Sequence, residues 1–203
     1  MVQANKIILT ALLALAAAVA SCSKLPLQQS HKYAPTSLDR RQGVDCWSYI
    51  QSASDLATMK EAIEKCGMQD YYSQSDRKCT YLLLDETAFF TYILPSLEVG
   101  DIGEAPVDKL KDILLFHIIK GEYDSYNGAV GYDPVYVLTM WQDVNAVMTI
   151  KLDDSVSKSN RQQDRLTLME QCGRSTAVKA TSSDLLMTNG PAHILSRNCV
   201  YKP

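Results

Sequence analysis

The sequence lacks the short motifs that usually mark an enzyme. It contains no Gly-x-Ser-x-Gly nucleophile motif, no Ser-x-x-Lys accompanied by its partner motifs, and no His-Glu-x-x-His zinc motif. It also lacks a glycine-rich phosphate loop, a Cys-x-x-Cys pair, and any Cys/His cluster with metal-site spacing. We therefore expect no catalytic residue, no metal and no cofactor.

Clustered positive charge is also missing. The 203 residues carry 20 Lys and Arg against 23 Asp and Glu, so the net charge is −3, and no charge run exceeds a few residues. Proteins that bind nucleic acids usually gather Lys and Arg on one face to neutralise phosphates. We therefore expect no nucleic-acid partner.

Long apolar runs are absent except near the start of the chain. Ile7–Ala20 is 14 residues long, which is shorter than the about 20 residues of a membrane-spanning helix. Lys6 precedes this run and small residues follow it, as in a secretory signal. The end of the run, Val19-Ala20-Ser21-Cys22, resembles the bacterial lipobox. The pattern predicts a signal peptide at residues 1–21 and acylation (palmitate) of Cys22; the alternative is an ordinary signal with a chance cysteine.

A lipidated Cys22 would anchor the protein to a membrane without spanning it, because several acyl chains on one residue give stable attachment. Ser23 follows in place of an aspartate, which favours the outer membrane of the cell envelope and leaves the leaflet open. Residues 22–45 are polar and contain Pro26 and Pro35, so we expect a tether there. The pair Arg40-Arg41 is a candidate protease site. The remainder, 46–203, suits one domain.

Five cysteines remain once Cys22 is set aside, and an odd number leaves at least one free thiol. One or two disulfides are possible in an oxidising compartment. Several of these cysteines lie in apolar runs, which favours buried free thiols. The pairing stays open for Cys46, Cys66, Cys79, Cys172 and Cys199.

Helical periodicity dominates the first half of the domain. Apolar positions at helical spacing predict a helix from Leu56 to Cys66, ended by Gly67. Asp85 is a cap for a second helix that ends at Pro95, and a third helix runs from Pro106 to Gly121.

Strands dominate the second half, where the period falls to two. Asn189-Gly190 predicts a hairpin. The expected strands are Cys79–Leu84, Val135–Met140, Ala146–Leu152, Arg165–Glu170, Thr176–Ala180, Asp184–Met187 and Ala192–Tyr201. Helices followed by strands predict an α+β fold.

This order of elements, from Trp47 to Pro203, resembles the fasciclin-like domain. "SYIQSASDLATMKEAIEKCGM" is similar to its opening helices, and "CTYLLLDETAFF" to its first signature, through Thr80, Asp85 and Phe89. Leu82-Leu83-Leu84 replaces the usual Phe-Ala-Pro, so the chain looks like a divergent member.

Two further signatures of the fasciclin-like domain follow in order. "DKLKDILLFHIIKGEY" is similar to the central signature through Phe116 and His117, and "MTNGPAHILSRNCVYKP" to the closing one through Asn189, Gly190 and His193. The resemblance implies N-terminal helices packed on a twisted β-sheet wedge of about seven strands, and it implies protein or glycan partners without a reaction.

Histidines are few, and only two of the three lie in the expected domain. His31 falls in the tether. His117 and His193 are candidates for a ligand or an acid–base group, but a packed, hydrogen-bonded histidine is the favoured interpretation, with Asp85 as a partner for His117.

Tyrosine is abundant, with 11 in the chain. Four follow the third helix in a glycine-containing segment, and Tyr and Trp are common in recognition surfaces. The candidate binding surface is Tyr123, Tyr126, Tyr132 and Tyr136; the alternative is packing of a loop on the sheet. The polar loop Ser155–Gln163 is a second candidate contact region.

These patterns favour a non-catalytic, lipid-anchored envelope protein for adhesion or extracellular recognition of protein or glycan. An accessory lipoprotein subunit of an outer-membrane complex, for instance one for polysaccharide uptake, is the alternative. A hydrolase that uses His117 or His193 is a third hypothesis.

Overall fold

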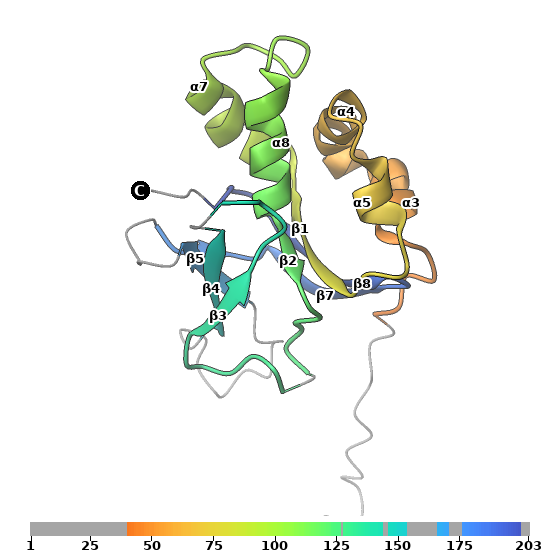
Figure 1. The fold of residues 1–203 in the computed structure, drawn as a ribbon, viewed down its shortest axis with the longest axis vertical. Helices are drawn as coiled ribbons and strands as arrows, with labels where there is room; N and C mark the ends of the chain where they lie inside the picture. Colours follow the sequence, from red (N-terminus) through yellow and green to blue (C-terminus); the bar gives the residue numbers. More distant parts are fainter. Residues whose placement is uncertain (1–39, 127, 144–145, 154–165, 171–175, 200–203) are drawn as a thin grey trace, which may run out of the picture. The chain divides into compact units, whose positions relative to one another are not determined.

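A computed structural model describes residues 40–126, 128–143, 146–153, 166–170 and 176–199 (Figure 1). All of them belong to one compact unit, Asp39–Pro203. The predicted signal peptide, Cys22, His31, Cys172 and the loop Ser155–Gln163 lie outside the described residues.

Four short helical segments open the domain: α3 (Cys46–Ser52), the 3-10 turn Ser54–Leu56, α4 (Ala57–Lys65) and α5 (Gln69–Ser73). Asp45 caps α3, since its carboxylate accepts a hydrogen bond of 2.9 Å from the Ser48 backbone N–H. Gly67 follows α4 with φ +63°, a conformation that glycine adopts freely. The helix predicted to end at Gly67 is confirmed.

Strand β1 (Cys79–Leu84) and the Asp85 cap are also where the sequence places them. Asp85 accepts a hydrogen bond from the backbone N–H of Ala88, and the helix proceeds as α6 (Glu86–Ala88), a π-helical turn (Phe89–Ile93) and α7 (Leu94–Leu97). The predicted end at Pro95 is wrong. Pro95 falls in the first turn of α7, where its missing N–H does little harm.

The third helix, α8 (Val107–Phe116), is shorter than predicted. Ile118–Lys120 form β2, antiparallel to β1, with Thr80 opposite Ile119 and Tyr81 opposite Ile118. The expectation of a helix reaching Gly121 is therefore wrong. β-branched Ile118 and Ile119 gain more from pairing with β1 than from one further helical turn.

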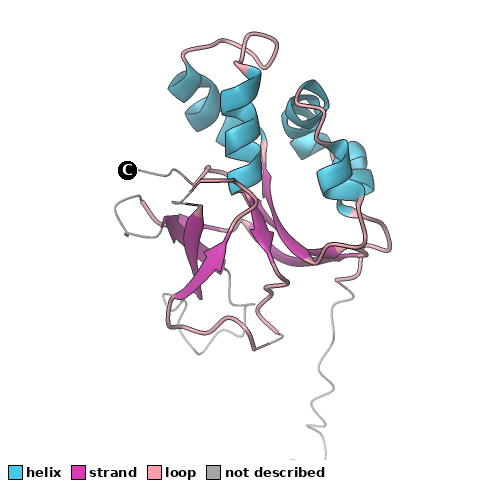
Figure 2. Ribbon diagram, in the orientation of Figure 1, coloured by secondary structure: helices cyan, strands magenta, loops and turns pink. Residues whose placement is uncertain are grey.

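The remaining strands are β3 (Val135–Leu138), β4 (Val147–Leu152), β5 (Leu166–Glu170), β6 (Val178–Lys179), β7 (Ser182–Met187) and β8 (Gly190–Leu195). They form two sheets, with orders β2-β1-β8-β7 and β3-β4-β5-β6. β8 runs parallel to β1 and antiparallel to β7. The sheets meet where the Met140 backbone N–H donates to the Ile118 carbonyl at 2.7 Å. Figure 2 shows the helices gathered at one end and the strands at the other.

The α+β prediction is confirmed. Eight strands lie in the described residues, where about seven were expected, because β2 replaces the end of a helix.

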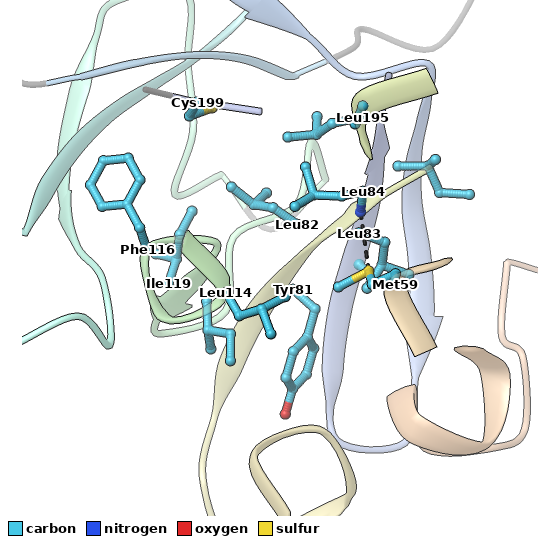
Figure 3. Close-up of a cluster of buried hydrophobic side chains, with 14 of the residues drawn as sticks. Met59, Tyr81, Leu82, Leu83, Leu84, Leu114, Phe116, Ile119, Leu195 and Cys199 are labelled. Atoms are coloured by element: carbon cyan, nitrogen blue, oxygen red, sulfur yellow. Dashed lines mark hydrogen bonds between the residues drawn. The ribbon is translucent and has the colours of Figure 1, made fainter. Parts of the chain in front are cut away.

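The core is centred on β1, all six residues of which are buried. Leu82, Leu83 and Leu84, which replace the Phe-Ala-Pro of the fasciclin-like pattern, lie between Met59 on one side and Phe116 on the other (Figure 3). The Met59 sulfur accepts a hydrogen bond of 3.2 Å from the Leu84 backbone N–H. Because successive side chains of a strand point to opposite faces, the leucine run gives β1 buried apolar contacts on both faces.

The hairpin between β7 and β8 is one residue out of the expected register. Met187 pairs with Gly190, so Thr188 and Asn189 form the turn and Gly190 belongs to β8. Gly190 has φ +141°, and a Cβ there would lie 2.0 Å from the Cys79 carbonyl oxygen. Its role is close approach to β1, and not a turn.

The last residues of the expected tether, Arg40–Val44, lie along the free edge of β7. Arg41 bridges Leu186 in parallel. Three backbone hydrogen bonds of 2.9 Å hold the segment: Leu186 N–H to the Arg40 carbonyl, Gln42 N–H to the Leu186 carbonyl, and Thr188 N–H to the Val44 carbonyl. This segment covers a sheet edge that would otherwise be open.

Candidate binding site

Asn189 is a structural link between the hairpin and the first helices. Its Oδ1 accepts a hydrogen bond of 3.0 Å from the Cys46 backbone N–H. Its Nδ2 donates to the Tyr72 carbonyl at 2.8 Å, to the Tyr81 hydroxyl at 3.1 Å and to the Gln74 carbonyl at 3.3 Å. A buried amide with every polar atom engaged fixes the packing and leaves nothing for a ligand.

His117, at the end of α8, is engaged at both ring nitrogens. Nδ1 donates to the Ile113 carbonyl at 2.7 Å, and Nε2 accepts from the Cys199 backbone N–H at 2.9 Å. Burial lowers the pKa of His117 from 6.5 to about 4, although the bond to Ile113 opposes the shift. The expected partner Asp85 is wrong: its carboxylate accepts from the Ser196 hydroxyl.

His193, in β8, is engaged in the same way. Its Nδ1 accepts a hydrogen bond of 3.1 Å from the Asp184 backbone N–H, and its Nε2 donates to the Tyr123 carbonyl at 3.0 Å. Burial lowers the pKa of His193, which the nearby Asp184 carboxylate partly offsets. His193 therefore fixes the segment after β2 to the sheet as a neutral ring.

Asp184 holds the same segment with its side chain. It has φ +61° and accepts hydrogen bonds from the Ser125 backbone N–H at 2.8 Å and hydroxyl at 2.5 Å. The Arg40 guanidinium lies 3.7 Å from this carboxylate and 3.4 Å above the centre of the Tyr126 ring. The start of the described chain and the tyrosine segment are thus tied together.

The other residues of the fasciclin-like pattern are structural in position. The Thr80 hydroxyl donates to the Gly121 carbonyl at 2.8 Å and accepts from the Tyr123 backbone N–H at 2.8 Å. Phe89 is buried at the start of the π-helical turn, and Phe116 is buried at the end of α8.

The four predicted surface tyrosines divide by exposure. Tyr123 is half-buried and packs against the core, whereas Tyr126 and Tyr132 are exposed. Tyr136 is 66% exposed and shares the outward face of β3 with Leu138, 56% exposed. Tyr136 and Leu138 form an exposed apolar pair, while Val137 between them faces the core.

A cavity that the sequence did not predict lies beside the C-terminal half of α8. Its volume is about 320 Å³, and it is lined by Tyr92, Ser96, Asp112, Ile113, Phe116, Trp141, Arg197, Asn198 and Cys199. The rings of Phe116 and Trp141 meet edge to face, with centroids 5.9 Å apart. The Arg197 guanidinium lies 4.7 Å from the centre of the Tyr92 ring. We call this the aromatic pocket.

The four cysteines in the described ranges, Cys46, Cys66, Cys79 and Cys199, are free thiols. Burial raises the pKa of Cys199 to about 12 and that of Cys46 well above its usual value, so neither is a reactive thiolate at neutral pH. Within the same ranges, His, Cys, Asp and Glu nowhere form a group of three or more suited to a metal. None of the helices in the described part has the length and apolarity to cross a bilayer.

Comparison with known proteins finds similarity among solved structures. No protein-family model and no curated protein matches the chain. Among solved structures, the chain is similar to a FAS1 domain pair from the insect cell adhesion molecule fasciclin I, with a TM-score of 0.55 and 14% sequence identity. The match covers 78% of this chain and 51% of that one, so this chain spans about half the length of the domain pair. The described part of the protein therefore has the FAS1 fold, that of the fasciclin-like domain.

Proposed function

We propose that the protein is a non-catalytic, lipid-anchored module of the bacterial cell envelope that mediates adhesion or extracellular recognition of protein or glycan. The observation that carries this proposal is the FAS1 fold, which the chain shares with a domain pair of an insect cell adhesion molecule. The lipobox-like residues Val19–Cys22 supply the anchor, and a serine at position 23 favours the outer membrane.

The geometry of the two histidines supports binding in preference to catalysis. A general acid or base needs a ring nitrogen that reaches the substrate and a pKa near the working pH. Both nitrogens of His117 and of His193 are bonded to backbone groups, and burial holds both rings neutral. Neither ring has a free nitrogen with which to move a proton.

Exposed aromatic side chains support a recognition role. Tyr126, Tyr132 and Tyr136 combine a large apolar ring with a hydroxyl, and such residues often carry most of the energy of a contact. Many copies of an anchored module on one surface would add weak contacts by multivalency.

The exposed pair Tyr136 and Leu138 favours a second candidate function, that of an accessory subunit of an outer-membrane complex. Adjacent apolar residues on a sheet face suit a permanent partner better than a weak, polyvalent contact.

The test uses the full-length chain expressed in a Gram-negative host. Intact mass of the purified protein should show loss of residues 1–21 and addition of acyl chains, and Cys22→Ser should abolish both. Cys66→Ser, which removes a half-buried free thiol of the domain, is the matched control and should leave the modification unchanged.

Binding is then measured with the lipidated protein on vesicles, against extracellular proteins and glycans. Vesicle-bound protein should bind at least one of these far more tightly than the same protein in detergent. Recovery of a stoichiometric partner from solubilised membranes would favour the accessory subunit instead. An unmodified Cys22 together with no binding would contradict the proposal.

A further inference from the structure

The aromatic pocket has the size and shape of a ligand site. Its volume of about 320 Å³ lies at the lower end of the about 300–1,000 Å³ typical of small-molecule pockets. It joins residues from α7 and the turn before it, from α8, from the segment after β3, and from the segment after β8. A site of this size fits a single ring of a larger ligand, and not an extended chain.

Aromatic rings supply the apolar walls. Phe116 and Trp141 stand at 88° to one another, and Tyr92 forms a further wall under the Arg197 guanidinium. Two perpendicular rings present a face and an edge to anything that enters. Flat apolar walls of this kind accept a ligand with a broad C–H surface.

Asn198 supplies an amide side chain on the wall of this apolar setting. The residue is 6% exposed, and no hydrogen bond joins its side chain to any other residue that the structure describes. Buried amides in proteins nearly always have partners. An amide that lines a cavity without one is therefore available to a ligand, to which it can both donate and accept.

Two charged groups of opposite sign complete the lining. Arg197 contributes guanidinium N–H donors, and Asp112 contributes a carboxylate acceptor from the exposed side of α8. Within the described ranges no ion pair or hydrogen bond engages either side chain; Arg197 contacts only the Tyr92 ring. The two charges balance, so the pocket suits a neutral ligand with groups that both donate and accept.

We propose that the aromatic pocket binds one neutral pyranose ring of a saccharide. The C–H face of the sugar packs on Trp141 or Tyr92, and neighbouring hydroxyls donate to Asp112 and accept from Arg197 and Asn198. This inference rests on the proposed recognition function and assigns a ligand class to a definite place in the fold.

Trp141 provides the readout. The chain has two tryptophans, so Trp47→Phe leaves Trp141 as the only one. The full-length protein in detergent is titrated with methyl α- and β-glycosides of glucose, galactose, mannose and N-acetylglucosamine. At least one glycoside should change Trp141 fluorescence saturably.

Variants assign the binding to the pocket. Arg197→Gln and Asn198→Ala should each weaken the affinity about tenfold or more, since each removes hydrogen bonds to the sugar. The matched control is Arg77→Gln, because Arg77 also stacks on a tyrosine, Tyr71, at 5.8 Å, but does not line the pocket. Arg77→Gln should leave the affinity unchanged, and thermal melts should show that all three variants fold.

The inference is overturned if no glycoside changes the fluorescence, or if Arg197→Gln and Asn198→Ala bind as well as the parent. It is also overturned if aromatic amino acids or peptides bind the pocket and glycosides do not. A vesicle adhesion assay distinguishes this failure from failure of the proposed function. If both variants still adhere, only the sugar site in the aromatic pocket is contradicted. If the parent protein adheres to no surface, the proposed recognition function is contradicted.

Discussion

Replacement of Asn189 by alanine should strongly destabilise the protein, because it removes hydrogen bonds between the hairpin and distant elements. The amide links the turn to Cys46 at the start of α3, to Tyr72 in α5 and to Tyr81 in β1. These bonds join residues more than a hundred positions apart in the sequence, so their loss weakens contacts between distant elements.

The magnitude follows from the groups that lose their partner. Asn189→Ala leaves the Cys46 N–H, the Tyr72 carbonyl and the Tyr81 hydroxyl without this bond in a dry environment, because Asn189 itself is 4% exposed. Each buried unsatisfied group costs about 1–3 kcal/mol, and partial relaxation reduces the sum. We expect a loss of about 3–5 kcal/mol, which is a large part of the about 5–15 kcal/mol that stabilises a domain.

The assay is urea unfolding at neutral pH, followed by tryptophan fluorescence and by far-ultraviolet circular dichroism. The midpoint should fall while the slope with denaturant stays constant. Asn198→Ala is the matched control, since Asn198 is equally buried but its side chain has no hydrogen bond within the described residues. It should change stability by about 1 kcal/mol or less. Equal losses for the two variants, or less than about 1 kcal/mol for Asn189→Ala, would refute the reasoning.

Two further predictions concern the glycine at the β1–β8 contact and the buried histidines. Gly190→Ala should prevent folding or lower the melting temperature severely, because its Cβ would lie 2.0 Å from the Cys79 carbonyl oxygen. The control is Gly67→Ala, where φ is +63° and no atom lies within 4 Å of the added Cβ; it should lower the free energy of unfolding by only about 1–2 kcal/mol in the same thermal melt. Burial lowers the pKa of His117 from 6.5 to about 4, so this side chain binds a proton more readily in the unfolded chain than in the native protein. The free energy of unfolding should therefore be highest above pH 6.5 and should fall as the pH drops toward 4. Urea unfolding should therefore show a loss of about 2 kcal/mol between pH 7 and pH 5 from His117, with His193 acting in the same direction; equal stability at the two pH values would contradict the burial argument.

Local features of the fold were predictable because they depend on neighbours in sequence. The run Cys79–Leu84 has no polar residue except Thr80, and it forms β1 with the expected bounds. Asp85 follows it and caps α6, as its short side chain and position indicate.

Features that depend on distant partners were missed. The apolar positions of α8 continue at helical spacing into Ile118, and only pairing with β1 ends the helix. Pro95 lies inside a helical segment because a π-helical turn precedes it, and the sequence carries no simple mark of such a turn.

In the candidate site, too, features within one segment were predictable and features that join distant segments were not. Of the four tyrosines predicted as a binding surface, three are exposed and Tyr123 packs against the core, and the sequence did not identify the aromatic pocket. Tyr92 and Arg197 are more than a hundred residues apart, and only Arg197 lies in one of the fasciclin-like signatures. Their meeting is a product of topology, so a pattern within one segment could not have found it.

The edge segment Arg40–Val44 has a mechanical consequence. If the chain is held at Cys22, any tension between the membrane and a bound partner enters the domain at Arg40. A pull along this segment loads its three backbone bonds to Leu186 and Thr188 together, in shear, where a peeling force would break them singly. For a chain anchored in this way, the edge segment would resist sliding more than peeling, and the direction of the pull would decide how long an attachment lasts.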